Sequence, residues 1–243
     1  EADVMMLLDH PNIVTVYDAG ETKGRYFMAM EYVHGTDVAE ISHRYRQKNL
    51  PMSVECACSI MVPVLRALDY AHNARSKSGK HLGIVHRDVT PSNIFISLNG
   101  QIKLGDFGVA KLLGIEQWTM LGSLKGKLRY LSPEQVIGNP PEPSFDLWAA
   151  SISLYELLAG HKVFLGENEL DTMLQIKGVK LPKLRKVNKV VPKELGRIIQ
   201  KALHKKASKR YPTAKELLQD LESFLGSNFL EQQALVNAIK APL

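Results

Sequence analysis

Apolar residues repeat with two different periods along the chain, and the change of period predicts where strands give way to helices. Residues 13–19 and 26–32 have strand patterns, and residues 20–24 between them have the length and composition of a hairpin loop. An apolar stripe in residues 1–9 predicts the end of an amphipathic helix, stopped by the His-Pro pair that follows. From residue 54 to residue 72 the apolar spacing is helical.

The rest of the chain is predicted to be mostly helical. Residues 73–83 are polar, with Ser and Gly, and are expected to form an exposed loop. Residues 145–159 form a long apolar segment that ends at Gly160, a residue type suited to a helix end. Further helical patterns, including a final tail, lie at residues 169–176, 192–203, 214–225 and 229–240.

Residues 94–104 return to a strand pattern around Asn99-Gly100, a strong signal for a two-residue hairpin turn. Counting outward from that turn pairs Ile96 with Lys103, Ile94 with Gly105, and Asn93 with Asp106. Cross-strand partners have Cβ atoms about 5 Å apart, so an amide oxygen and a carboxylate at these positions can share one divalent ion. The alternative is two polar residues at the mouth of a hairpin.

Composition limits the classes of protein that fit these patterns. The chain has 243 residues, 45% hydrophobic and 23% charged, as in ordinary globular proteins. Its longest apolar stretch, residues 56–65, is too short to span a bilayer. Cys56 and Cys58 lie in this stretch at a spacing that points to different sides of a helix, and we expect buried reduced thiols in a reducing compartment.

The net charge of +6 is unevenly distributed. Residues 177–215 contain fourteen Lys or Arg and a single acid, Glu194. Such a stretch is either a solvated helical face or a docking surface for an acidic partner or an anionic surface. Few aromatic residues interleave the charges, which disfavours nucleic-acid binding.

Three short segments carry candidate chemistry. They are His86-Arg87-Asp88-Val89-Thr90-Pro91-Ser92-Asn93, then Asp106-Phe107-Gly108, then Ser132-Pro133-Glu134. In this order and spacing they resemble the protein kinase family. The resemblance implies an α+β, protein-kinase-like fold with a mostly helical C-lobe and a remnant of the N-lobe sheet. The implied boundaries are residues 1–32 for that remnant, 33–225 for the hinge and C-lobe, and 226–243 for a C-terminal helical tail.

The resemblance also implies roles for individual residues in a phosphoryl transfer that depends on positioning and charge. Asp88 matches the catalytic aspartate, and Asn93 and Asp106 match the Mg²⁺ ligands. Around ATP, Met30 resembles the gatekeeper, Glu31 and Val33 the hinge, Asp37 the ribose-facing acid and Phe95 the apolar floor. Without this resemblance, Met30 and Phe95 would be interpreted as residues of the hydrophobic core.

Further positions resemble structural elements of the family. The stacked hydrophobic spine is matched by Met5, Val16, His86 and Phe107. Asp146, with Trp148, resembles the acid that anchors the catalytic loop, and Glu134 with Arg210 resembles a buried ion pair.

Two departures from the family pattern affect function. Glu1 aligns with the regulatory-helix glutamate, so the glycine-rich loop and the strand lysine would lie upstream, and this piece alone is not expected to be active. Most serine/threonine kinases have Lys two residues after the catalytic aspartate and Thr after the glycine of the substrate-facing loop. Here Thr90 and Lys127 are exchanged, as in bacterial and especially myxobacterial kinases. Lys127 is either a substitute cation for the phosphate or a solvated loop lysine.

The resulting hypothesis is a cytoplasmic serine/threonine kinase that uses ATP and Mg²⁺ on a protein substrate, although a longer protein carrying this chain can be membrane-anchored. Arg87 and Lys111 would bind an activating phosphate on Thr119 or Ser123. The alternative is a pseudokinase or scaffold module without catalysis.

Overall fold

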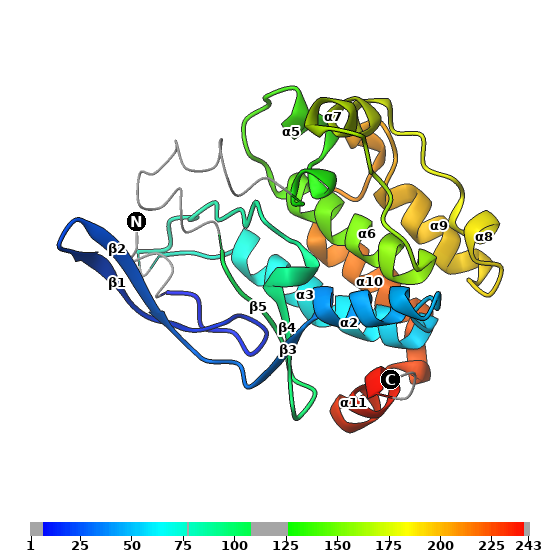
Figure 1. Cartoon of the computed structure of the whole chain (residues 1–243). Coiled ribbons are helices and arrows are strands. Elements are labelled where there is room, and N and C mark those ends of the chain that lie inside the picture. The colour runs from blue at the N-terminus through cyan, green and yellow to red at the C-terminus, as the bar shows by residue number, and fades with distance from the viewer. Residues whose placement is uncertain (1–6, 77, 108–125, 241–243) are drawn as a thin grey trace.

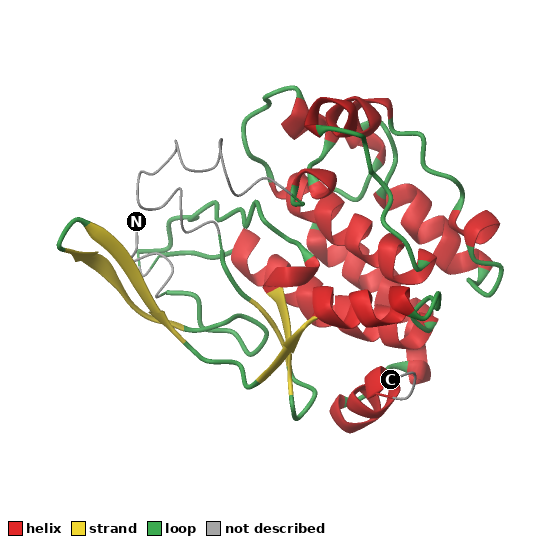
Figure 2. Cartoon of the chain, viewed as in Figure 1, coloured by secondary structure: helices red, strands yellow, loops and turns green. Residues whose placement is uncertain are grey.

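The β1–β2 hairpin and the helices lie on opposite sides of the molecule (Figures 1 and 2). This computed structural model describes residues 7–76, 78–107 and 126–240. Strands β1 (Val16–Thr22) and β2 (Arg25–Met30) are antiparallel. Lys23 and Gly24 between them have φ of 50° and 71°, as a two-residue type I′ turn requires. The loop is therefore shorter than the predicted residues 20–24.

A three-stranded sheet joins this hairpin to the helices. It consists of β3 (Gly35–Asp37), β4 (Ile94–Ser97) and β5 (Ile102–Leu104), in the order β3-β4-β5. Asn12 and Val14 exchange backbone hydrogen bonds with Leu104, so the segment before β1 lies along β5.

The predicted register of the β4–β5 hairpin is wrong by one residue. Phe95, not Ile96, faces Lys103. The loop has three residues, because the Gly100 N–H bonds to Ser97 O and Gly100 itself has φ of 81°, a type I turn followed by a left-handed residue. Gly105 N consequently bonds to Asn93 O, and Asp106 lies one residue beyond the position opposite Asn93.

Helices make up most of the described chain. The α-helices are α2 (Val38–Gln47), α3 (Val54–His72), α5 (Pro133–Val136), α6 (Pro143–Ala159), α7 (Glu169–Gly178), α8 (Leu184–Val187), α9 (Lys193–Ala202), α10 (Ala214–Leu225) and α11 (Gln232–Lys240). Short 3₁₀ helices are η1 (Pro91–Asn93), η2 (Leu128–Tyr130), η3 (Ala207–Lys209) and η4 (Gly226–Asn228). Helices α3 and α10 begin and end at the predicted residues, and α11 starts three residues into the predicted tail.

The sequence patterns do not predict α2. Its start is set by Asp37, whose carboxylate accepts a hydrogen bond from Glu40 N at 2.8 Å. Val38, Ile41 and Tyr45 are buried on one face. At the N-terminus, Leu7 lies in a turn and residues 8–10 are not helical, so the predicted helix does not extend through residue 9; residues 1–6 lie outside the described part.

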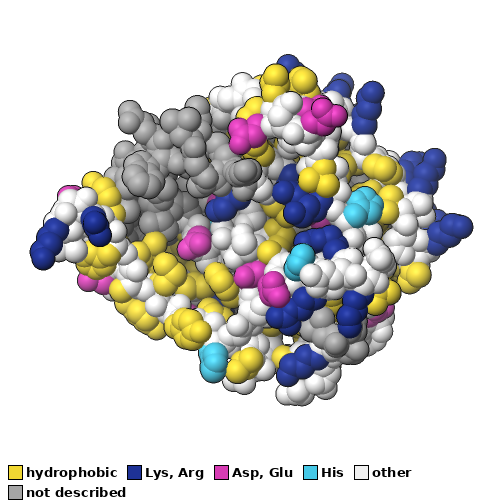
Figure 3. All heavy atoms as spheres, viewed as in Figure 1, with side chains coloured by type: hydrophobic (Ala, Val, Ile, Leu, Met, Phe, Trp, Pro, Cys, Tyr) yellow, Lys and Arg dark blue, Asp and Glu magenta, His cyan; other side chains and the backbone are white. Residues whose placement is uncertain are grey.

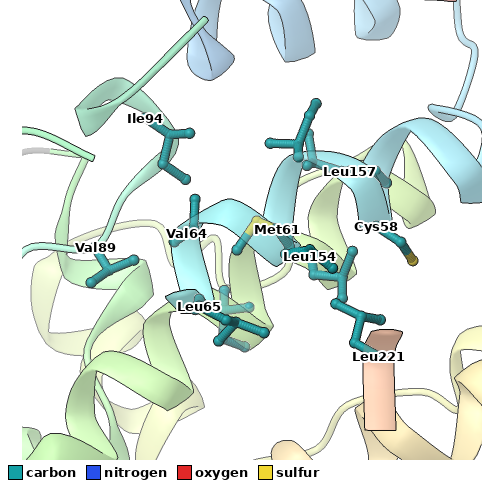
Figure 4. Packing of buried hydrophobic residues seen from close by; sticks show 14 of the residues in the cluster. Cys58, Met61, Val64, Leu65, Val89, Ile94, Leu154, Leu157 and Leu221 are labelled. Atoms are coloured by element: carbon teal, nitrogen blue, oxygen red, sulfur yellow. The ribbon is translucent and has the colours of Figure 1, made fainter. Parts of the chain in front are cut away.

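Helix α3 is the centre of the core and packs against α6 and α10 (Figure 4). Because other elements surround it, Cys56 and Cys58 are both buried although they point in different directions, and both are free thiols. Burial raises the pKa of the Cys56 thiol to about 12. No helix within the described residues has the length and apolarity that crossing a membrane requires.

Candidate active site

The loop before η1 is anchored on helix α6 by one buried carboxylate. Asp146 is 1% exposed. Its Oδ1 accepts a hydrogen bond from Arg87 N at 2.7 Å, and its Oδ2 accepts from His86 N at 2.8 Å. His72 Nε2 lies 2.8 Å from the same Oδ2. These bonds hold Arg87 at a φ of 70°, which non-glycine residues seldom adopt. The predicted anchoring role of Asp146 is confirmed.

His86 links this loop to the segment after β5. Its ring is fully buried, and burial lowers the pKa of His86, so the imidazole is neutral. Nδ1 accepts from Asp88 N at 3.2 Å, which leaves Nε2 as the donor to Gly105 O at 2.9 Å. The Phe107 ring packs on the imidazole at a centroid distance of 4.3 Å. The predicted contact of these two rings is therefore present.

Asp88 is held by two side chains from different segments. Its Oδ2 accepts from Asn93 Nδ2 at 2.9 Å and from Lys127 Nζ. Asn93 Nδ2 also bonds to Asp88 O at 2.8 Å, because η1 turns the chain back at this point. Thr90 is buried, and its hydroxyl bonds to the Ser92 hydroxyl at 2.9 Å. The cation in contact with Asp88 is thus Lys127, from the segment before η2, and position 90 holds a neutral hydroxyl.

Asp106 and Phe107 border a pocket beneath the β1–β2 hairpin. Asp106 has φ of 57°, which turns the chain away from β5 immediately after Gly105. The other residues that line this pocket are apolar: Leu8, Ile13, Val14, Val16, Met28 and Met30. The gatekeeper candidate Met30 and the spine candidate Val16 therefore share one pocket with Asp106.

Glu31, the first hinge candidate, is tied to β5. Lys103 Nζ lies 2.8 Å from Glu31 Oε2, and Thr15 N donates to the same oxygen at 3.2 Å. Burial alone would raise the pKa of Glu31, but the Lys103 ammonium and the Thr15 N–H hold it below its ordinary value. The sequence does not predict this role of Lys103, since the register expected from the turn places Lys103 opposite Ile96.

Asp37, Phe95 and Lys103 form one row across the small sheet, because each is the cross-strand partner of the next. The opposite face consists of buried residues: Ile94, Ile96, Ile102 and Leu104. The Phe95 ring covers Gly105, where a Cβ would lie 2.8 Å from it. The structure thus places Asp37, Phe95 and Lys103 on one face of the small sheet. Val33, the second hinge candidate, follows β2 and is half-buried.

The predicted ion pair of Glu134 and Arg210 is confirmed. Two guanidinium nitrogens of Arg210 lie 2.9 Å from the two carboxylate oxygens. The Arg210 side chain is 3% exposed, donates to His204 O, and stacks on Trp148 at 4.4 Å. This pair ties the start of α5 to the loop before α10.

Several candidates lie outside the described residues: Glu1, Met5, Lys111, Thr119 and Ser123. Their roles remain predictions. Of the proposed phosphate-binding residues, only Arg87 is described, and its Nε is buried and has no hydrogen-bond partner within the described part of the chain.

Comparison with known proteins identifies the class to which this site belongs. The protein kinase domain family matches residues 1–221. The chain belongs to this family, and its described helices and strands form the α+β fold predicted from sequence. The solved kinase domain of PknI from Mycobacterium tuberculosis has a TM-score of 0.69 at 26% identity, covering 91% of this chain and 75% of that one.

The most similar curated proteins include bacterial kinases. The serine/threonine-protein kinase PrkC of Bacillus subtilis (strain 168) is 36% identical over 96% of this chain and 34% of PrkC. The tyrosine-protein kinase MasK of Myxococcus xanthus (strain DK1622) is 34% identical over 94% of this chain and 35% of MasK. The chain therefore spans about a third of the length of these relatives.

Proposed function

We propose that the protein carrying this chain transfers the γ-phosphoryl group of ATP to Ser and Thr hydroxyls of proteins. The observation that carries this proposal is the fixed carboxylate of Asp88. Its Oδ2 is occupied by Asn93 and Lys127, whereas its Oδ1 bonds to no described residue. That oxygen can accept the proton of an acceptor hydroxyl and orient its oxygen toward the phosphorus.

The same residues fit ATP and Mg²⁺. Asn93 uses its Nδ2 to bond Asp88, which leaves its amide oxygen as a metal ligand, and the carboxylate of Asp106 is the second candidate ligand. Bound Mg²⁺ would neutralise charge on the phosphates, and phosphates and water would complete its coordination. Met30, Glu31, Val33, Asp37 and Phe95 would hold the nucleotide; the carboxylate that caps α2 would also face the ribose.

Lys127 would supply the positive charge near the transferred phosphoryl group, which the neutral hydroxyl of Thr90 cannot supply. A transferring phosphoryl group needs positive charge near its equatorial oxygens. The Lys127 ammonium contacts Asp88 directly, so it lies where the acceptor oxygen and the phosphate would meet. The side chain of Lys127 is 38% exposed, which leaves one side of the ammonium accessible.

Other features of the whole protein are also proposals. Phosphorylation of Thr119 or Ser123 would order the loop through Arg87 and Lys111, and residues 177–215 would bind an acidic partner. We expect a cytoplasmic catalytic domain. A pseudokinase or scaffold is the alternative function, and tyrosine as the acceptor is a second candidate because MasK is named a tyrosine-protein kinase.

The test is phosphoryl transfer by the full-length protein with ATP labelled in the γ-phosphate. Matched peptides carry Ser, Thr or Tyr as the only acceptor, with and without Mg²⁺. We expect label on Ser and Thr, and no transfer when Mg²⁺ is chelated. Label on Tyr alone would overturn the acceptor class, and ATP binding without transfer to any acceptor would support the pseudokinase.

A further inference from the structure

Three cationic side chains from separate segments act electrostatically on, or respond to, one buried carboxylate, Glu156. Arg46 is on α2, Arg129 is in η2, and Lys162 follows α6. All three are half-buried. Arg46 and Arg129 lower the pKa of Glu156, and Glu156 raises that of Lys162. Arg129 and Lys162 directly precede Tyr130 and Val163, which both donate hydrogen bonds to Glu156. Among the described residues, none of them forms an ion pair. We call these three residues the basic cluster.

Glu156 is poorly placed to balance this charge. Its Oε2 accepts from Tyr130 OH at 3.0 Å and its Oε1 from Val163 N at 2.9 Å, so each oxygen already has a neutral donor. Burial raises the pKa of Glu156, although its two donors and the charges of Arg129 and Arg46 oppose this shift. One carboxylate therefore faces three cations, and the site has an excess of positive charge.

Within the described residues, the hydrogen bonds of these cations go to neutral groups and not to carboxylates. Arg46 Nη1 donates to Ser42 Oγ, and Arg129 Nε donates to Gly126 O at 2.9 Å, so their partners are neutral oxygens. Arg129 Nη1 is buried and has no hydrogen-bond partner in the described part of the chain. Burial and repulsion from Arg129 and Arg46 lower the pKa of Lys162. A buried guanidinium nitrogen without an acceptor is costly, so the positive charge of the basic cluster is not balanced within the described part of the chain.

The position of the basic cluster indicates which ligand would supply the missing negative charge. Arg129 is two residues after Lys127, which contacts Asp88. Figure 3 shows Lys and Arg side chains gathered on this face between α2 and the start of α5. Residues that flank a hydroxyl placed at Asp88 would therefore come within reach of Arg129.

We infer that the basic cluster binds an acidic side chain of the protein substrate, an Asp or Glu that lies a few residues from the phosphorylated hydroxyl. This inference rests on the proposed function and adds the class of substrate. The carboxylate would bind at the accessible side of the basic cluster and reduce the repulsion among the three cations. Opposite charges at such a site select the correct partner and disfavour basic sequences.

The experiment uses the full-length protein and peptides with one acceptor Ser, in which Glu, Gln or Lys is placed at each flanking position in turn. We expect at least one position where kcat/KM for Glu exceeds that for Lys by about tenfold, mostly through KM, with a preference that weakens as salt rises. Arg129→Gln and Lys162→Gln should reduce the Glu-to-Lys ratio toward one. Lys80→Gln, an exposed cation in the loop after α3, should leave the ratio unchanged.

A direct binding measurement separates this inference from the proposed function. Fluorescence anisotropy with labelled Glu and Lys peptides reports binding whether or not transfer occurs. Stronger binding of the Glu peptide, lost in Arg129→Gln, supports the basic cluster even if no phosphate is transferred. Equal affinity for both peptides, or a preference unchanged in Arg129→Gln and Lys162→Gln, overturns it even if the protein is an active kinase.

Discussion

The catalytic loop and the β1–β2 hairpin are stabilised in different ways. His86 and Arg87 are fixed by a carboxylate from α6, far away in sequence, inside the helical body. The hairpin is held mainly by pairing of its two strands, and Tyr17, Tyr26 and Phe27 are all more than 40% exposed. A two-stranded hairpin has little stability by itself. Substitutions in the helical body should therefore cost far more than similar substitutions in the hairpin.

The largest effect is expected from Glu134→Gln. It leaves the 3% exposed Arg210 without its carboxylate, which should lower the free energy of unfolding by about 3–5 kcal/mol. The control is Glu222→Gln, because its partner Arg66 is 46% exposed and the loss should stay below about 1 kcal/mol. Urea denaturation followed by circular dichroism compares them. Equal losses in the two variants would contradict the contrast between buried and exposed pairs.

The next effect is expected from Asp146→Asn, which replaces one acceptor oxygen by a donor group facing backbone N–H groups. Amides of His86 and Arg87 should exchange hydrogen about a hundredfold faster, which corresponds to about 3 kcal/mol. Amides in β1 and β2 should be unaffected. Hydrogen exchange with mass spectrometry measures both, and Asp171→Asn, on the exposed first turn of α7, is the control. Unchanged exchange at the catalytic loop would show that α6 does not hold it.

Lys127→Ala tests the cation in contact with Asp88. The turnover number should fall by about two orders of magnitude with little change in ATP affinity. The double variant Thr90→Lys with Lys127→Thr should recover much of the loss, whereas Lys80→Ala, an exposed lysine in the loop after α3, should have no effect. Steady-state kinetics decide. Near-normal turnover in Lys127→Ala would identify Lys127 as a loop lysine without a role in transfer. No recovery in the double variant would contradict the exchange of roles between positions 90 and 127.

The smallest effect is expected in the hairpin. Tyr17 is 64% exposed, and Tyr17→Ser should change the free energy of unfolding by less than about 0.5 kcal/mol. Tyr155 is 2% exposed, and Tyr155→Ser should cost about 3–5 kcal/mol. Thermal unfolding of both variants gives the comparison. A large loss for Tyr17→Ser would mean that the hairpin is more strongly packed than its exposure indicates.

The sequence predicts the elements better than their pairing. The long helical spacing of apolar residues predicts α3 to the residue, and in the structure Ser53 caps its start. The β4–β5 register was missed because an Asn-Gly pair fits both a two-residue and a three-residue loop, and only the backbone of Gly100 decides. A slip of one residue moves every side chain to the other face, so the pairing of Lys103 with Glu31 could not be predicted.

The motifs also predict the site better than its surroundings. Asp88, Asn93 and Lys127 could be singled out because short family patterns contain them, and the structure brings all three into contact. The basic cluster could not be predicted, since Arg46, Arg129 and Lys162 come from three distant segments that only the tertiary fold brings together.

Asp88→Asn in the full-length protein tests most directly the claim that Asp88 orients the acceptor hydroxyl. The variant keeps the side-chain shape but removes the base, and none of the expected nucleotide contacts involves this side chain. Transfer of labelled phosphate should fall by about a thousandfold or more, while ATP affinity measured by calorimetry on the same sample stays close to that of the wild type. Transfer within about tenfold of the wild type, with ATP still bound, would contradict the account.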